Sequence, residues 1–415
     1  MKRLFTVGMV VLFILSLVSV STATNGYFSH GFGIKNKALA GTGVALPLDS
    51  FATAMNPAGM VYVGTRIDVG LSLFNPNRSY TVSGQPSGLG FGLQPGTVDS
   101  DSEWFLIPAL GANKMLNENN ALGIAIFGNG GMNTDYDKRT FGGSSPTGVD
   151  LIQLFVTPTY AVKLHPKHAV GISAIGAYQS FEAKGLQQFV NFSRDPSDLT
   201  NNDHASSFGG GARIGYLGEV LPSLFLGASY QTRIYMSKFD DYKGLFAEHG
   251  DFDIPQTWTI GLAYKALPSL TFAADVQEIY YGDIRAINNP LIPNLLTNKL
   301  GDEHGAGFGW EDMTIFKFGV QWESSDVWTW RAGYSYGEEP IKGDQVLFNI
   351  LAPGVPQNHV TAGFTRKIGK NQGIDFAAMH AFSHSVAGPN PLDPVQTIRI
   401  RMNQWEFSVG YSWKF

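Results

Sequence analysis

The chain closes on the stretch QWEFSVGYSWKF, residues 404–415, in which apolar and polar side chains alternate one by one. Every second residue from Trp405 to Phe415 is apolar, and the residues between them are polar or small. Successive side chains of a β-strand point to opposite faces, so this period of two predicts a strand with one apolar and one polar face. Such a strand fits a soluble barrel as well as a membrane barrel, and the rest of the sequence has to distinguish the two.

The composition favours a membrane barrel. The 415 residues include 49 glycines and no cysteine, with 13% aromatic and only 15% charged residues. This balance is typical of transmembrane β-barrels, whose apolar residues are interleaved with polar ones. The formal net charge of −5 argues against nucleic acid as a partner. No phosphate-binding loop, nucleophile elbow or cysteine metal motif is present, so we expect no enzymatic activity, no cofactor and no metal.

The first residues have the features of a secretory signal peptide. Lys2 and Arg3 precede an apolar run that ends at Val20, and Ser21-Thr22-Ala23 supplies the small residues needed for cleavage. We therefore predict a signal peptide over residues 1–23; the alternative is a membrane-anchoring helix. No later stretch approaches the roughly 18 consecutive apolar residues that a spanning helix needs.

Beyond residue 61 the chain divides into about fourteen alternating segments, joined by connections that are short and long in turn. Short turns at one end and long loops at the other are the pattern of bacterial outer-membrane barrels. We therefore predict an all-β protein, a transmembrane antiparallel β-barrel of about 14 strands over residues 61–415, in the outer membrane of a Gram-negative bacterium. We expect a monomer surrounded by outer-membrane lipid and lipopolysaccharide.

The end of the chain is then the closing strand, which pairs with the first strand and removes the edge of the sheet. Phe415 resembles the C-terminal aromatic residue of outer-membrane proteins, which the outer-membrane assembly machinery recognises. We therefore predict that Phe415 is an assembly signal.

Residues 24–60 do not have the alternating pattern of the barrel. They are rich in Gly and Ala, and this composition predicts a hatch, or plug, that packs inside the lumen. The stretch SHGFGIKNKALAGTGVALPLDSFATAMNPAGM, residues 29–60, carries the triplet Asn56-Pro57-Ala58 just before the barrel begins. Together with residues 315–341 and 348–364, it resembles the FadL/TodX family of outer-membrane hydrophobic-compound transporters.

The resemblance implies a route for the ligand. Outer loops of that family catch a hydrophobic molecule, which passes to a pocket in the lumen and leaves sideways at a kink in the third strand. The third segment here contains Gly128-Asn129-Gly130-Gly131, and three glycines in four residues favour a bulge or bend. We predict a lateral gate at these residues; the alternative is an ordinary bulge at the barrel rim.

Two long loops contain apolar residues that a water-facing loop does not need, and the start of the mature chain adds three aromatic residues. We predict a capture site or ligand pocket at these positions; the alternatives are loops that only pack on one another and plain hatch packing. Lys317 and Arg331 are further candidates for binding a carboxylate group. The predicted capture and pocket residues are Tyr27, Phe28, Phe32, Leu291, Ile292, Leu295, Leu296, Leu347, Phe348 and Ile350.

The resulting prediction is passive uptake of a hydrophobic molecule, with long-chain fatty acids, alkanes and monoaromatic hydrocarbons left open as substrates. The alternative function is a general diffusion porin, which would use the same barrel with an open lumen.

Overall fold

The computed structural model describes residues 25–88 and 90–415, so the predicted signal peptide lies outside the described residues. Seventeen strands form one sheet that closes on itself. The closure is made by β1 (Arg66–Ser83), which pairs along its whole length with β17 (Asp393–Lys414). Three strands of the wall are each divided into two pieces, so the barrel has fourteen antiparallel strands, as predicted.

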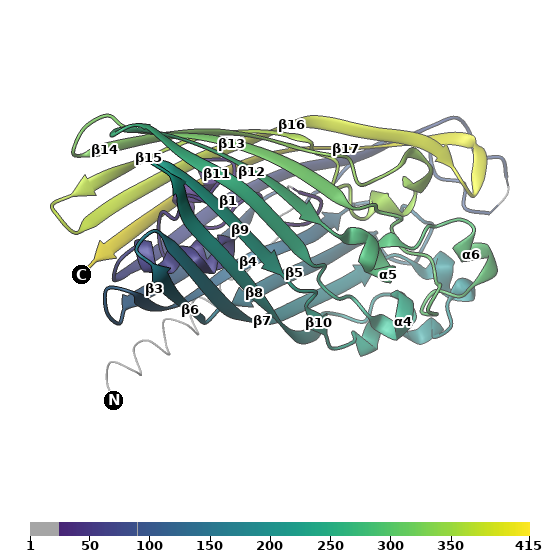
Figure 1. Ribbon diagram of the computed structural model, residues 1–415. Helices are drawn as coiled ribbons and strands as arrows, with labels where there is room; N and C mark the ends of the chain where they lie inside the picture. Colours follow the sequence, from purple (N-terminus) through teal and green to yellow (C-terminus); the bar gives the residue numbers. More distant parts are fainter. Residues whose placement is uncertain (1–24, 89) are drawn as a thin grey trace, which may run out of the picture.

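The strands follow one another around the barrel, each paired with its neighbours in the chain (Figure 1). The divided strands are β2 (Gly96–Asp99) with β3 (Phe105–Met115), β5 (Gly148–Val156) with β6 (Thr159–His165), and β9 (Leu224–Gln231) with β10 (Tyr235–Met236). The other strands are β4 (Asn120–Asp135), β7 (His168–Lys184), β8 (Ala205–Leu221), β11 (Thr257–Leu267), β12 (Leu270–Ile279), β13 (Met313–Glu323), β14 (Trp328–Gly337), β15 (Asn358–Ile368) and β16 (Gln372–Asn390).

Short helices occur only before the barrel and in its long loops, within the described ranges. None of these helices is long and apolar enough to cross a bilayer. The N-terminal segment contains α2 (Ile34–Lys37), α3 (Ala52–Met55) and the 3-10 helix η1 (Pro57–Tyr62). The loops contain η2 (Gln187–Phe192), η3 (Pro196–Asp198), η4 (Asp240–Tyr242), α4 (Ala247–Gly250), η5 (Tyr281–Asp283), α5 (Arg285–Asn288), α6 (Asn294–Thr297), η6 (Gly343–Gln345) and η7 (Phe348–Ile350).

The two ends of the barrel differ in the way the alternation of connections predicts. Figure 1 shows α4, α5 and α6 gathered at one end, while the C-terminus lies at the opposite end among the short turns. The wall has the expected two faces: Trp405 and Val409 are 42% and 53% exposed on the outside, whereas Glu406 is 2% exposed and faces the lumen. The apolar face of β17 is therefore the one that meets lipid.

One expectation about the loops is wrong. The alternation of connections predicts a long loop between the last two strands, but β16 and β17 form a long hairpin with a two-residue turn at 391–392. Pro389 and Pro394 lie in this hairpin, although proline cannot donate a hydrogen bond to a sheet. Beyond Ala381, however, β16 pairs only with β17, and proline is tolerated at such an edge.

The N-terminal residues 25–62, which we call the hatch, lie within the wall of strands. Figure 1 shows this segment in purple, toward the end that carries the C-terminus. Most of its side chains are buried, including the charged residues Lys35, Lys37 and Asp49. The hatch therefore brings polar groups into the lumen, where they meet the polar inner face of the wall.

Candidate functional site

Glycines of the wall allow the hatch to lie directly against the strands. A Cβ added at Gly215 of β8 would lie 2.0 Å from Oδ1 of Asn56, and one at Gly171 of β7 would lie 2.4 Å from the carbonyl carbon of Pro57. No side chain fits in such a space, so these positions require glycine. The wall glycines whose added Cβ would lie less than 3.0 Å from a hatch atom are Gly111, Gly123, Gly130, Gly171, Gly215, Gly227, Gly333, Gly363 and Gly410.

Two buried lysines join the hatch to carboxylates of the wall. Nζ of Lys35 lies 3.0 Å from Asp375 of β16, and Lys37 pairs with Glu406 of β17. Nζ of Lys37 also donates to Oγ of Ser72 at 3.0 Å. A buried charge is costly unless it is paired, so these contacts select the position in which the hatch is docked. The sequence interpretation did not identify these residues, although two lysines in a segment of small residues were a visible signal.

The electrostatics of the hatch are dominated by burial. Loss of water raises the pKa of the Asp49 carboxyl, although Lys35 opposes the shift from 3.7 Å. Burial likewise lowers the pKa of the His30 imidazole to about 4, against the attraction of Glu406. His30 is therefore neutral at pH 7 in the docked hatch.

The triplet Asn56-Pro57-Ala58 caps η1 and binds it to the wall. Nδ2 of Asn56 donates to the carbonyl oxygens of Val44 and of Tyr216 on β8, each at 2.7 Å. Its Oδ1 accepts from the amide of Ala58 at 3.1 Å, which is an N-cap. The triplet packs on β7 and β8, and not on the predicted gate at the glycines of the third strand.

The start of the hatch occupies that place. The pairing of β4 with β5 shifts register between Gly128 and Gly130, so Asn129 is an extra, bulged residue. The carbonyl oxygen of Asn129 accepts from the amide of Ser29 at 2.9 Å, and the amide of Gly131 donates to the carbonyl of Tyr27 at 2.9 Å. The hatch thus adds a short strand-like segment, residues 27–29, to the bulge of the third barrel strand.

The adjacent wall strand is also irregular. It is interrupted between β5 and β6 at Thr157-Pro158, and Pro158 has no amide hydrogen to donate. The hatch contacts this break as well, because Oγ1 of Thr157 donates to Oγ1 of Thr53 at 3.1 Å. Two neighbouring strands are therefore irregular at the level where hatch residues cover the wall.

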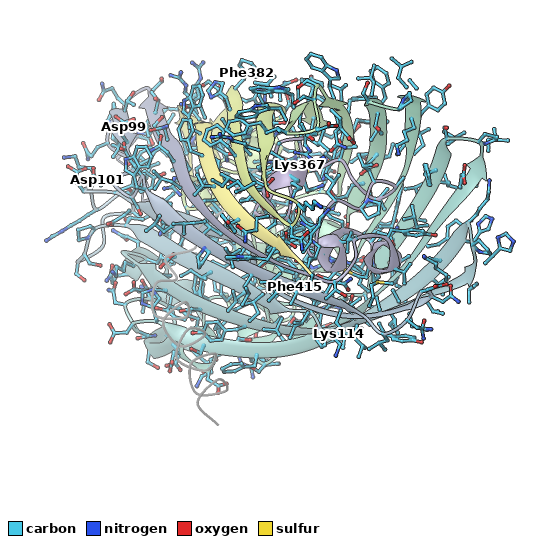
Figure 2. The ribbon with its side chains drawn as sticks, turned by 90° about the vertical axis from the view of Figure 1, so that its left-hand side faces the viewer. Asp99, Asp101, Lys114, Lys367, Phe382 and Phe415 are labelled. Atoms are coloured by element: carbon cyan, nitrogen blue, oxygen red, sulfur yellow. The ribbon has the colours of Figure 1, made fainter. Side chains whose placement is uncertain are left out.

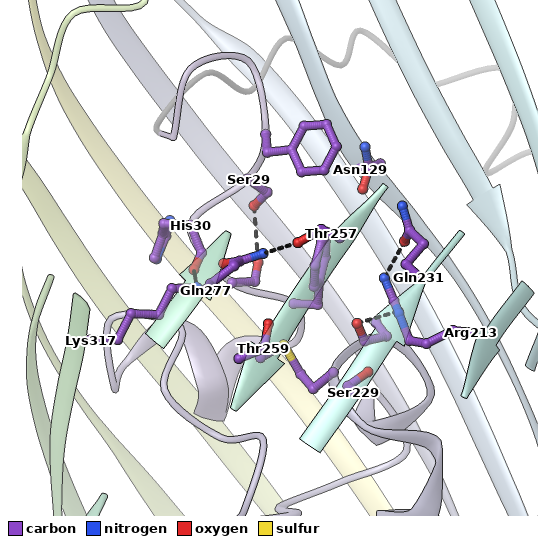
Figure 3. A pocket seen from close by; sticks show the side chains of 15 residues that line it. Ser29, His30, Asn129, Arg213, Ser229, Gln231, Thr257, Thr259, Gln277 and Lys317 are labelled. Atoms are coloured by element: carbon purple, nitrogen blue, oxygen red, sulfur yellow. Dashed lines mark hydrogen bonds between the residues drawn. The ribbon is translucent and has the colours of Figure 1, made fainter. Parts of the chain in front are cut away.

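A polar pocket of about 30 Å³ lies between the hatch and the wall (Figure 3). Phe28 and Phe32 line it from the hatch, as does Asn129 from the bulge. Figure 3 shows Lys317 and Arg213 reaching it from different sides. The remaining lining residues are Ser29, His30, Gly31, Ala54, Met55, Ser229, Gln231, Thr257, Thr259 and Gln277.

Two cations of this pocket have no carboxylate within ion-pair distance, although Asp275 on the neighbouring strand attracts Lys317 from farther away. Among the described residues, neither Arg213 nor Lys317 makes an ion pair within 4.0 Å. Arg213 donates to hatch carbonyls and to Gln231, and Nζ of Lys317 is 3.3 Å from the carbonyl oxygen of His30. Lys317, a predicted candidate, therefore faces the pocket, whereas Arg331 lines a different cavity nearer the short turns.

A second cavity, also about 30 Å³, lies under the outer loops and is wholly apolar in its lining. It belongs to the largest hydrophobic cluster, which extends down to Tyr27 and Phe28 of the hatch. The ring of Tyr27 lies 5.1 Å from that of Tyr281 and 6.0 Å from that of Trp310. The lining residues are Val149, Phe181, Leu186, Phe189, Leu245, Phe246, Ala286, Leu300, Ala306, Gly307, Phe308, Phe348 and Leu351.

Most of the predicted loop residues pack inside this cluster. Leu291, Leu295, Leu347 and Ile350 are buried, Ile292 is half-buried and packed against them, and Leu296 is exposed. Of the predicted loop residues only Phe348 lines the apolar cavity. The phenylalanines of the other loops could not be selected from sequence, because nothing in their local pattern shows which loops meet.

Phe415 lies at the end of the closing strand, where its amide donates to the carbonyl of Thr65 at 3.0 Å. Its side chain is 75% exposed and faces outward beside Ile67 and Leu122. The residue is therefore accessible, as a recognition signal requires.

A closed barrel with an apolar outer face and a polar lumen filled by its own N-terminal segment is an outer-membrane transport barrel. The family model described as "Outer membrane protein transport protein (OMPP1/FadL/TodX)" matches residues 15–403, and the chain belongs to this family. It is a transport protein of the outer membrane. A comparison with curated protein sequences gave no match.

Solved structures share the fold at low sequence identity. The toluene transporter TodX of Pseudomonas putida has 19% identity and a TM-score of 0.68, over 93% of this chain and 99% of that one. The toluene transporter TbuX of Ralstonia pickettii has 18% identity and a TM-score of 0.63, over 93% and 99%. A Pseudomonas aeruginosa FadL homologue has 15% identity and a TM-score of 0.68, over 94% and 100%.

Proposed function

We propose that the protein takes up hydrophobic molecules passively, by capture under the outer loops, transfer to the lumen pocket and exit through the wall beside Asn129. The observation that carries the proposal is the apolar cavity under the loops, whose lining includes five phenylalanines and no charged residue. Small-molecule sites are typically lined by apolar and aromatic side chains, and this lining suits a hydrocarbon surface. The relatives TodX and TbuX, described as toluene transporters, agree with such a ligand.

The apolar cluster supplies a continuous set of contacts for the transfer. It connects the loop phenylalanines with Tyr27 and with Phe28, which is also part of the lumen pocket. A ligand that moves along this cluster keeps its apolar surface away from water, which is favourable by about 0.8 kcal/mol for each CH₂ group.

The lumen pocket favours a ligand with a polar or acidic end. Arg213 and Lys317 bring positive charge to a buried place that has no ion-pair partner for either among the described residues. A carboxylate bound between them would form charge-assisted hydrogen bonds. A fatty acid would match the chemistry of both linings, with its chain along the apolar cluster and its head between Arg213 and Lys317, whereas toluene matches only the apolar lining.

The lateral exit is supported by the two irregular strands. Residues 27–29 of the hatch cover the bulge at Asn129 through backbone hydrogen bonds. If residues 27–29 and Thr53 move away, the bulge and the neighbouring break at Thr157-Pro158 are left without their hatch partners. A gap at this level leads an apolar ligand from the lumen to the bilayer without crossing water.

Deleting Asn129 tests the exit. The deletion removes the extra residue and allows β4 and β5 to pair in one regular register. We expect uptake of radiolabelled oleate by whole cells to fall at least about tenfold, while abundance and heat-modifiable mobility stay normal. Deleting Phe382 is the matched control. It removes the bulge between Ala381 and His384 of β16, and none of these residues lines the lumen pocket.

Unchanged uptake in the folded Asn129 deletion would argue for passage straight through the lumen. The alternative function, a general diffusion porin, predicts a large ion conductance for the intact protein. Single-channel recording separates the two, because a barrel filled by its hatch conducts few ions.

A further inference from the structure

A third cavity lies inside the barrel at the end of the short turns, with a volume of about 400 Å³. One side of it is formed by hatch residues, among them Leu48 and Tyr62, and by the adjoining Val63, and strands β1 and β13 to β17 form the other. It shares no lining residue with the lumen pocket. Its volume falls in the range of small-molecule sites, about 300–1,000 Å³. Figure 2 looks on to this end of the barrel, where Lys367 and Phe415 are labelled.

The charges that line this cavity are unbalanced. Arg331, Lys367, Lys370 and Lys414 all line it, and none makes an ion pair within 4.0 Å among the described residues. The lining contains a single carboxylate, that of Glu323. The other two lining cations, Lys35 and Arg66, are already paired with Asp375 and Asp68 of the wall.

Arg331 shows why the imbalance matters. Its guanidinium is buried, and it donates through Nε to Gln321 at 2.8 Å and through Nη1 to Thr365 at 2.7 Å, both uncharged groups. Asp375, Asp49 and Glu323 attract it, but each lies beyond 4.0 Å, so the guanidinium makes no direct ion pair with them. An anion that enters the cavity would form a direct ion pair with this buried cation and would meet the three lysines as well.

Apart from Lys35, which is paired with Asp375, the hatch side of the cavity is apolar. Leu48 and the adjoining Val63 face it, and Tyr62 contributes a ring that is 38% exposed. The site therefore combines positive charge on the strands with an apolar surface on the hatch. A ligand that fits both has an acidic group on a short apolar body.

We propose that this cavity is a binding site for a small organic anion, such as an alkyl carboxylate, that enters from the periplasm. Lipids of the bilayer are excluded as ligands because the barrel wall separates them from the cavity. The hatch separates the cavity from the lumen pocket. The site is distinct from the two cavities assigned to transport, since it shares no lining residue with either of them.

Calorimetric titration of the full-length protein in a neutral detergent tests the site, with octanoate as the probe. We expect K367Q/K370Q/K414Q to bind octanoate at least about tenfold more weakly than the wild type. The control K114Q/K167Q/K265Q removes the same number of positive charges from exposed lysines near other short turns, none of which lines the cavity. Its affinity for octanoate should be within about twofold of that of the wild type. The double variant K367Q/K370Q leaves the closing strand intact, should the triple variant fail to assemble.

Two further probes define the ligand class. Octan-1-ol has the same chain without the charge, and its binding should not respond to the lysine substitutions. Inorganic phosphate has charge without the chain and should bind much more weakly than octanoate. The proposal would be overturned if the two triple variants lost affinity for octanoate equally, or if phosphate bound as tightly as octanoate does.

Crystals soaked in 8-bromooctanoate locate the ligand directly. The anomalous signal of bromine is expected in the cavity, beside Tyr62 and Val63, in the wild type and in the lumen variant K317Q. A bromine peak only in the lumen pocket, or no peak in either cavity, contradicts the assignment. Retention of the cavity peak in K317Q separates this site from the lumen pocket proposed for transport.

Discussion

The amide of Gly131 donates a hydrogen bond to the carbonyl oxygen of Tyr27 at 2.9 Å, so the first described residues of the chain are bonded to the third strand of the barrel wall. The neighbouring residue Gly130 leaves room for this contact, since its added Cβ would lie 2.0 Å from the same oxygen. The bulge of β4 and the start of the hatch therefore form one unit, and a change in either is expected to affect the other.

Replacing Gly130 with Ala is expected to displace residues 27–29 from β4, because its methyl group would collide with the backbone of Tyr27. Amide hydrogen exchange in residues 27–32 should accelerate at least about tenfold. The control is Gly176→Ala on β7, where an added Cβ would meet only Val156 at 3.9 Å. Equal protection of residues 27–32 in both variants would show that Gly130 does not hold the hatch segment.

Removing residues 25–62 is expected to leave a folded barrel, because the strands pair with one another and β1 closes on β17 without the hatch. Ion conductance should rise by about tenfold or more once the lumen is open, and selective uptake of hydrophobic compounds should fall. Single-channel recording measures the ion conductance, and heat-modifiable mobility checks that the barrel is folded. A truncated protein that conducts no better than the intact one would contradict the assignment of this segment as a plug.

Replacing Lys37 with Met leaves the carboxylate of Glu406 buried and without its cation. Breaking a buried pair from one side costs about 3–5 kcal/mol, so the docked hatch should be weakened by that order. We expect frequent channel openings in single-channel recordings, and fewer in the double variant K37M/E406Q, which removes the unpaired charge. Lys138→Met, which breaks an exposed pair with Asp137, should have no effect.

Acidic conditions should loosen the hatch through His30. Its pKa is lowered to about 4 in the docked state by burial, and by Lys37 and Lys317, against the attraction of Glu406. An undocked imidazole with an ordinary pKa of about 6.5 binds a proton first as the pH falls, so the docked state loses stability between pH 6.5 and 4. The loss amounts to about 3 kcal/mol when the fall is complete.

The measurement is channel opening as a function of pH. Openings of the wild type should increase as the pH falls from 6.5 to 4, and His30→Gln, which cannot take up this proton, should respond much less. An identical pH response in wild type and variant would assign the effect to other groups.

Deleting Phe415 should reduce the amount of protein in the outer membrane more than the uptake per assembled molecule. The residue is the exposed end of the closing strand and makes one backbone hydrogen bond there, to Thr65. Quantitative immunoblots of outer-membrane fractions, combined with uptake normalised to abundance, check this. A matched deletion of Leu296, an exposed apolar residue of an outer loop, should leave abundance unchanged.

The local sequence pattern was sufficient to predict the fold of this protein. Alternation of apolar and polar residues over 404–415 depends only on the pleat of one strand, and it correctly assigned Trp405 to the lipid side and Glu406 to the lumen. The same pattern, repeated along the chain with alternating short and long connections, was enough to predict fourteen strands. The family followed from a motif that is itself contiguous, around Asn56.

The tertiary structure alone decided which distant residues meet. Lys35 pairs with Asp375 and Lys37 with Glu406, across more than 300 residues of chain, because the closed barrel brings its last strands beside the N-terminal hatch. The loop residues that line the apolar cavity were likewise selected by how the loops fold over one another, and Phe348 was the only one predicted. A sequence records the period of each strand locally, but the contacts across a lumen depend on barrel closure, which no local pattern contains.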